Sequence, residues 1–91
     1  SLTIRVMETP GHTQGSVCQL VGDVMFSGDT LFRGSCGRTD FAGGDPKAML
    51  ASLDRLAALP GNYKVYPGHE GATELDYERR VNPFMTRRHS L

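Results

Sequence analysis

Three short segments of the chain place a side chain that can bind a metal directly after a glycine. They are Pro-Gly-His at residues 10–12, Ser-Gly-Asp at residues 27–29 and Pro-Gly-His at residues 67–69. Each follows a strand-like stretch, and strand ends are rigid enough to hold a ligand within the tolerances that a metal demands. Imidazole and carboxylate groups together suit zinc, iron or manganese. The pattern predicts that His12, Asp29 and His69 meet at one metal site.

Each of these residues has a more ordinary interpretation when it is taken alone. A single His is usually a surface or packed residue. An Asp after a strand is more often a turn former or a helix cap than a ligand. The threefold repetition of strand, glycine and ligand favours the metal interpretation, because composition does not explain it.

The strands that must position these residues can be inferred from the alternation of apolar and polar residues. Leu2, Ile4 and Val6 predict a half-buried strand over residues 2–8. Residues 16–21 predict a second strand, and Gly22-Asp23 a hairpin turn into a third strand over residues 24–27. Residues 63–66 predict a fourth. Residues 28–45 are rich in glycine and predict a long loop, which in a compact domain is usually functional.

Two helices complete the predicted fold. Asp45-Pro46 is typical of a helix start, Met49, Leu53 and Leu56 form an apolar stripe, and Pro60-Gly61 predicts the end. Residues 75–80 predict a short polar helix. The order of elements predicts an α/β (α+β) fold with one mixed, mostly antiparallel sheet and helices on one face. Such a sheet keeps an open apolar face unless a second layer covers it, so part of the domain is expected to be missing.

Composition narrows the class of protein. The 91 residues allow at most one domain, and ten Lys and Arg balance ten Asp and Glu, which argues against nucleic acid or an anionic membrane as a partner. No apolar run approaches the roughly 20 residues of a membrane span. Cys18 and Cys36 are too few for a disulfide framework, and no secretory leader opens the chain, so a cytoplasmic protein with reduced thiols is expected.

Four motifs resemble the C-terminal half of metallo-β-lactamase-fold hydrolases. They are Thr-Pro-Gly-His-Thr-Gln-Gly-Ser at residues 9–16, Phe-Ser-Gly-Asp-Thr-Leu-Phe at 26–32, Cys-Gly-Arg-Thr-Asp-Phe at 36–41 and Val-Tyr-Pro-Gly-His at 65–69. The branch that they resemble most is the glyoxalase II-like, or hydroxyacylglutathione hydrolase-like, enzymes. The resemblance runs from about Val6 to Met85 and includes the closing residues 78–84. It implies that residues 1–91 are the C-terminal half of an αββα sandwich whose N-terminal metal-binding half is absent.

The resemblance also assigns roles to the three residues. It implies that His12 completes the first metal site, that Asp29 bridges two metals and that His69 completes the second. The other ligands of the family lie in a His-x-His-x-Asp-His motif that this chain lacks, and its remaining histidine, His89, is expected to be a solvated tail residue. A dinuclear catalytic site needs more than three protein ligands. The complete enzyme is therefore expected to hold two divalent metals, zinc before iron or manganese, and this fragment alone is expected to be inactive.

The implied activity is hydrolysis of a small-molecule thioester, glutathione-linked in the family, by a hydroxide that the two metals share. Asp29 is then both a metal ligand and the catalytic residue. Arg38 is implied to bind a substrate carboxylate, and its alternative role is a structural ion pair with Asp40. Cys36 is expected to pack in the interior. Gly71 stands where glyoxalase II has an aromatic residue, and the helical extension of that enzyme is missing, which argues against S-lactoylglutathione as the substrate.

Two other functions remain open. Residues 33–41 also resemble persulfide dioxygenases, which use a single iron and molecular oxygen. Alternatively, the chain is a non-catalytic fragment that self-associates through its open sheet face, because large exposed apolar patches usually bind a partner.

Overall fold

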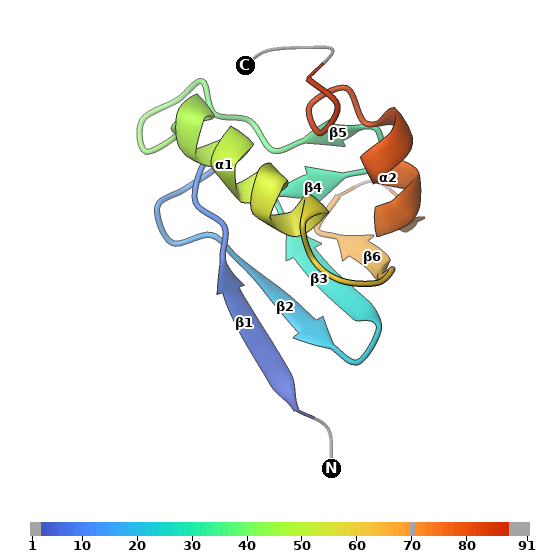
Figure 1. Cartoon of the computed structure of the whole chain (residues 1–91). Helices are drawn as coiled ribbons and strands as arrows, with labels where there is room; N and C mark the ends of the chain where they lie inside the picture. The colour runs from blue at the N-terminus through green and yellow to red at the C-terminus, as the bar shows by residue number, and fades with distance from the viewer. Residues whose placement is uncertain (1–2, 70, 88–91) are drawn as a thin grey trace.

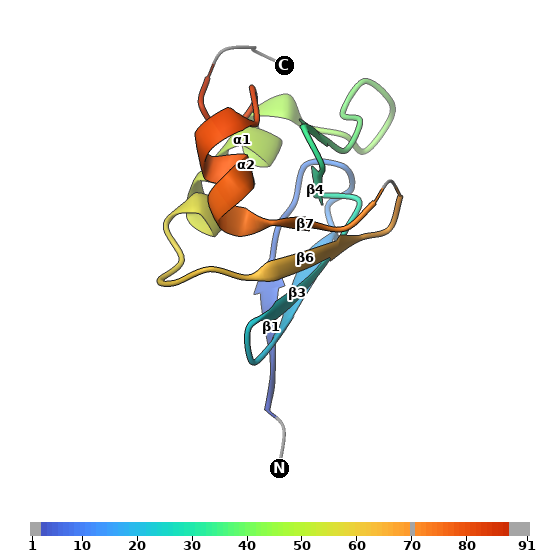
Figure 2. The ribbon, with the colours of Figure 1, turned by 90° about the vertical axis from the view of Figure 1, so that its right-hand side faces the viewer.

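The computed structural model describes residues 3–69 and 71–87, and its main element is a five-stranded sheet. The strand order is β1-β2-β3-β6-β7. The strands are β1 (Ile4–Glu8), β2 (Val17–Val21), β3 (Val24–Gly28), β6 (Lys64–Pro67) and β7 (Thr73–Glu74). Every neighbouring pair is antiparallel except β3 and β6. Both helices, α1 (Pro46–Ala57) and α2 (Leu75–Val81), lie on the same side of this sheet (Figures 1 and 2), which confirms the predicted fold class.

The parallel pairing of β3 with β6 follows from the connection between them. Parallel neighbours need a crossover rather than a tight turn, and α1 is that crossover (Figure 1). β1 and β3 are both antiparallel to β2, so β1, β3 and β6 run in one direction. Their C-terminal ends therefore lie at the same edge of the sheet.

The start of α1 is where the sequence predicts it. Oδ1 of Asp45 accepts hydrogen bonds from the backbone nitrogens of Lys47 (3.0 Å) and Ala48 (3.2 Å), and Pro46 begins the helix. These contacts satisfy amide groups that have no partner within the first turn. The helix ends at Ala57, before the predicted Pro60-Gly61 stop.

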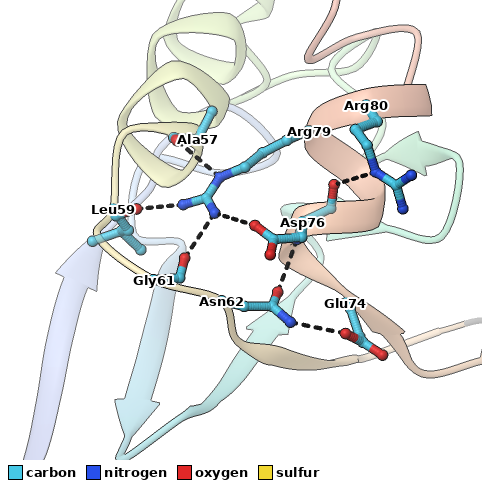
Figure 3. A network of polar contacts seen from close by, with 8 residues as sticks. All are labelled: Ala57, Leu59, Gly61, Asn62, Glu74, Asp76, Arg79 and Arg80. Atoms are coloured by element: carbon cyan, nitrogen blue, oxygen red, sulfur yellow. Dashed lines mark hydrogen bonds and ion pairs between the residues drawn. The ribbon is translucent and has the colours of Figure 1, made fainter.

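The early end of α1 is stabilised by Arg79 of α2. Its guanidinium donates hydrogen bonds to the carbonyls of Ala57 (3.0 Å), Leu59 and Gly61 (2.7 Å), and it pairs with Asp76 at 2.6 Å (Figure 3). The last carbonyl groups of a helix have no N–H donor within the helix, and they carry partial negative charge. A cation that donates several hydrogen bonds satisfies both requirements, so Arg79 ties the end of α1 to α2.

The core lies between the helices and the inner face of the sheet. Its members are apolar side chains that are buried, among them Cys18, Leu20, Met25 and Val65 of the sheet and Met49, Leu53, Leu56 and Leu75 of the helices. The apolar stripe predicted for α1 therefore packs as expected.

The outer face of the sheet carries exposed apolar residues. Val6, Phe26 and Tyr66 are 61%, 46% and 44% exposed. The register places Val6 opposite Gln19, Gln19 opposite Phe26 and Phe26 opposite Tyr66, so all lie on one face. The half-buried strand predicted for residues 2–8 is wrong in this respect: Ile4 and Val6 face away from the helices, and within Ile4–Glu8 only Met7 is partly buried. Leu2, the third residue of the predicted apolar face, lies outside the described residues.

The glycine-rich segment contains an additional hairpin that periodicity did not predict. It consists of β4 (Leu31–Phe32) and β5 (Ser35–Cys36), and two-residue strands are too short to show alternation. β7 was missed for the same reason. No helix in the described ranges has the length and apolar character that crossing a membrane requires.

Candidate metal centre

The three residues that the sequence singles out come together at one edge of the sheet. His12, Asp29 and His69 follow β1, β3 and β6, whose C-terminal ends lie at the same edge of the sheet. Nε2 of His12 lies 3.5 Å from Oδ2 of Asp29, and Nε2 of His69 lies 3.2 Å from Oδ1. One carboxylate thus has an imidazole at each of its two oxygens.

This geometry consists of two pairs that share Asp29. Within residues 3–69 and 71–87, no three His, Cys, Asp or Glu side chains are arranged so that they could hold one metal ion together. Two ligand atoms on one tetrahedral zinc are about 3.3–3.4 Å apart, given bonds of about 2.0–2.1 Å. Both distances at Asp29 are close to that value. The arrangement fits a carboxylate between two cation positions better than a single three-ligand site.

A backbone hydrogen bond orients the ring of His12 toward Asp29. Nδ1 of His12 lies 2.9 Å from the carbonyl oxygen of Arg38. A carbonyl oxygen only accepts, so Nδ1 carries the proton, and in neutral imidazole Nε2 presents a lone pair. This leaves Nε2, which lies 3.5 Å from Oδ2 of Asp29, as the ring nitrogen that can bind a metal. Metal-binding histidines are commonly oriented in this way.

The centre is open to solvent on this chain. The side chains of His12, Asp29 and His69 are 24%, 38% and 73% exposed. A cavity of about 310 Å³ is lined by Arg33, Thr73, Tyr77 and neighbouring residues, but by none of the three candidate ligands. The candidate centre therefore lies on an open surface, away from this cavity.

Two close backbone approaches fix the loops that carry His12 and Asp29. Gly11 has φ +147°, and a Cβ there would lie 2.5 Å from Cα of Met49 in α1. A Cβ at Gly37 would lie 1.7 Å from the carbonyl oxygen of Asp29. Neither position accepts a side chain without a shift of backbone. The helix and the β4–β5 hairpin therefore pack directly against the segments that hold the candidate ligands.

Of the two roles considered for Arg38, a substrate contact and an ion pair with Asp40, the structure contains the ion pair. Nε of Arg38 lies 3.0 Å from Oδ1 of Asp40, and its guanidinium lies over the ring of Phe41 at 5.7 Å. The hydrogen bond from Arg38 lowers the pKa of Asp40. The contact with the candidate centre comes from the Arg38 backbone carbonyl, which sequence reasoning did not anticipate.

The cysteines pack in the interior, as expected for Cys36. Both are buried and free. Burial raises the pKa of the Cys36 thiol to about 11 and also raises the pKa of Cys18. His89 lies outside the described residues.

Two buried threonines join the loops beneath the centre, and sequence reasoning missed them. The hydroxyls of Thr9 and Thr30 lie 2.9 Å apart, and both residues are fully buried. Each lies close to a candidate ligand in the sequence, Thr9 three residues before His12 and Thr30 directly after Asp29. Their positions within the motifs at residues 9–16 and 26–32 could have indicated that they support the candidate ligands. Aromatic contacts were also missed: Phe41 approaches His12 at 5.1 Å and Phe32 approaches His69 at 5.9 Å, both edge to face.

Comparison with known sequences places residues 1–69 in the metallo-beta-lactamase superfamily. A hydroxyacylglutathione hydrolase of Cupriavidus taiwanensis is 45% identical over 89 residues, covering 91% of this chain and 33% of that protein. An uncharacterised protein of Mycobacterium leprae is 45% identical over 89 residues, covering 93% of this chain and 41% of that protein. The chain thus spans about a third to two fifths of the length of these curated relatives.

Solved structures agree with the sequence comparison. ETHE1 from Myxococcus xanthus is 42% identical with a TM-score of 0.86, covering 91% of this chain and 39% of that chain. TTHA1623 in a di-iron-bound form is 51% identical with a TM-score of 0.85, covering 89% and 42%. The BLEG-1 B3 metallo-beta-lactamase is 43% identical with a TM-score of 0.87, covering 93% and 42%. From its sequence, its sheet topology and these likenesses, the chain belongs to the metallo-beta-lactamase superfamily.

Proposed function

We propose that the protein to which this chain belongs is a metal-dependent hydrolase of the hydroxyacylglutathione hydrolase-like branch, acting on small-molecule thioesters. The observation that carries the proposal is the Asp29 carboxylate with an imidazole nitrogen at each oxygen. The similarity to hydroxyacylglutathione hydrolases over nine tenths of the chain supports the thioester class and a glutathione-linked substrate.

In this proposal His12, Asp29 and His69 would hold two divalent metals, one on the His12 side and one on the His69 side, with Asp29 shared between them. The donor set suits zinc, iron or manganese, and the di-iron form of TTHA1623 supports a pair of metals. When bound, the metals would bring the pKa of a shared water toward neutrality and polarise the thioester carbonyl. The residues of this chain orient the ligands: the Arg38 carbonyl keeps the proton of His12 on Nδ1, so that Nε2 faces Asp29.

Arg38 is proposed to bind a carboxylate of the substrate. Its present partner, Asp40, is 72% exposed at the side chain, and exposed ion pairs contribute at most about 1 kcal/mol. Exchange of Asp40 for a substrate carboxylate therefore costs little. The Phe41 ring beneath the guanidinium keeps Arg38 on the His12 side of the centre.

Residues 1–91 are proposed to be one half of a metallo-β-lactamase-like domain, with the N-terminal half supplying the remaining ligands. Three observations support this division: the relatives are longer, each His–carboxylate pair is coordinatively incomplete, and the outer face of the sheet is uncovered. The isolated chain is then expected to have no hydrolase activity.

The test is substitution of the proposed bridging ligand in the complete protein. Loss of residues that only support a ligand costs about 10–100-fold in metal affinity or activity, so Asp29→Ala should lose at least about 100-fold in thioester hydrolysis and bind less metal. Metal content by mass spectrometry and hydrolysis of a hydroxyacylglutathione measure the two effects. Asp23→Ala, in the exposed β2–β3 turn, is the matched control and should retain both. Two bound metals in Asp29→Ala would refute the assignment.

A persulfide dioxygenase-like mononuclear iron enzyme is the second candidate. The Cys-Gly-Arg-Thr-Asp-Phe run at residues 36–41 supports it, because residues 33–41 resemble persulfide dioxygenases. Metal analysis of the complete protein separates the candidates. One iron per chain with consumption of oxygen favours the dioxygenase, and two metals with hydrolysis favour the thioesterase.

A further inference from the structure

Two polar residues, one in α2 and one that caps its C-terminal end, are completely buried, although charged and amide side chains rarely are. They are Glu78 and Asn82, one helical turn apart, and Nδ2 of Asn82 donates a hydrogen bond to Oε1 of Glu78 at 2.9 Å. A buried carboxylate is tolerated only where hydrogen bonds replace its water. The partners of this pair therefore indicate what it holds in place.

Those partners lie on the β4–β5 hairpin and on β7. The backbone nitrogen of Gly34, in the hairpin turn, donates to Oε1 of Glu78 at 2.8 Å, and Oγ1 of Thr73 donates to Oε2 at 2.7 Å. Nδ2 of Asn82 also donates to the carbonyl of Ser35 at 3.0 Å. Among the described residues no buried side-chain nitrogen or oxygen lacks a partner. The pair thus fixes the hairpin from its turn.

The same hairpin segment, residues 31–38, touches all three candidate ligands. The Phe32 ring meets the His69 imidazole edge to face at 5.9 Å. Gly37 packs against the Asp29 carbonyl so closely that no Cβ fits between them. The Arg38 carbonyl accepts the hydrogen bond from Nδ1 of His12. A displacement of the hairpin would therefore disturb His12, Asp29 and His69 together.

We propose that Glu78 and Asn82 are positioning residues of the candidate metal centre, which they hold in place through residues 31–38. The inference rests on the proposed function only in that it requires a metal at this centre. Ligands bind a metal tightly only when their supports fix them within a fraction of an ångström. Glu78 and Asn82 do not contact the candidate ligands themselves; they contact the hairpin residues Gly34 and Ser35.

The test compares variants of the complete protein by metal affinity, measured by competition with a chelator, and by hydrogen exchange of the Gly34 and Gly37 amides without metal. Glu78→Ala should weaken metal binding about 10-fold or more and speed exchange at both amides. Glu78→Gln keeps an acceptor for Gly34, and the Thr73 hydroxyl can accept as well as donate. This variant should therefore remain within about threefold of wild-type affinity.

A matched control separates positioning from general loss of stability. Leu56→Ala opens a cavity under α1 in the core, outside residues 31–38, and should lower the melting temperature while metal affinity stays within about twofold of wild type. Asn82→Ala, which keeps the bond from Gly34 to Glu78, is the second variant if Glu78→Ala does not fold, and it should also weaken metal binding.

Three results would overturn the proposal. These are wild-type metal affinity in a folded Glu78→Ala or Asn82→Ala variant, an equal loss of affinity in Leu56→Ala, or a wild-type protein that binds no metal. A wild-type protein that binds metal but hydrolyses no thioester would refute the proposed function and leave this inference standing, because affinity and exchange do not depend on the substrate.

Discussion

At the scale of single residues, the centre is organised by one carboxylate and two differently held imidazoles. His12 is oriented by a backbone carbonyl at 2.9 Å and is three quarters buried, whereas His69 is 73% exposed and contacts a phenylalanine edge. The side of the centre at His12 is therefore built mainly by this chain. The side at His69 is more open to solvent.

Cys36 provides a residue-scale prediction about pH. Burial raises the pKa of its thiol from 9.0 to about 11 in the folded protein. The folded state thus favours the protonated thiol, and this contribution is complete below the unfolded pKa and is lost as the pH rises toward 11. The loss should reach about 2–3 kcal/mol.

Urea unfolding between pH 8 and pH 11 measures this effect, with Cys36→Ala as the control. The free energy of unfolding should fall more steeply for the wild type than for the variant. Parallel curves for the two proteins would show that thiol ionisation at Cys36 is not coupled to folding.

At the scale of elements, the junction of α1 and α2 depends on Arg79 (Figure 3). Its guanidinium reaches three backbone carbonyls and one carboxylate, and its side chain is 23% exposed. Hydrogen bonds from a charged group contribute about 1.5–3 kcal/mol. Arg79→Ala should therefore lower the free energy of unfolding by about 2–3 kcal/mol, and Arg79→Lys should recover only part, because an ammonium group cannot reproduce the planar fork.

The neighbouring Arg80 is the control for this prediction. It makes one long hydrogen bond, 3.4 Å from Nε to the Asp76 carbonyl, and lies over Tyr77 at the surface. Arg80→Ala should change the free energy of unfolding by less than about 0.5 kcal/mol. Equal losses in the two variants, measured by urea unfolding, would mean that the carbonyl contacts of Arg79 add nothing to stability.

At the scale of the whole molecule, one face of the sheet is covered by the two helices and the other is exposed. Ile4, Val6, Val17, Phe26 and Tyr66 form an apolar outer face, and the rings of Phe26 and Tyr66 stack at 5.9 Å. Exposed apolar area of this kind favours association. We expect the isolated 91-residue chain to self-associate through this face. In the complete protein, the rest of the domain is expected to cover it instead.

Light scattering and binding of an apolar dye check this expectation. Phe26→Lys combined with Tyr66→Lys should shift the isolated chain toward the monomer and reduce dye binding. Tyr77→Lys is the matched control, because Tyr77 is similarly exposed, at 43%, but lies on α2. A folded wild-type monomer that binds no dye would contradict the prediction.

The elements that depend on local chemistry could be predicted from the sequence. Asp45 and Pro46 set the start of α1, the spacing of Met49, Leu53 and Leu56 set its buried face, and Gly22-Asp23 set the β2–β3 turn. These features depend on residues within a few positions of one another. The short strands β4, β5 and β7 could not be predicted, because two residues carry no periodicity and their pairing depends on distant segments.

The sequence by itself determined that three metal-capable side chains each follow a strand and a glycine, and its motifs determined the superfamily. Only the tertiary structure decided that His12 and His69 face opposite oxygens of Asp29, that the Arg38 carbonyl contacts His12 and that Glu78 accepts a hydrogen bond from the hairpin turn. The structure also decided that Ile4 and Val6 face away from the helices. Ligand type and turn chemistry are local properties, whereas a shared carboxylate, a tautomer and a covered face depend on which distant segments meet.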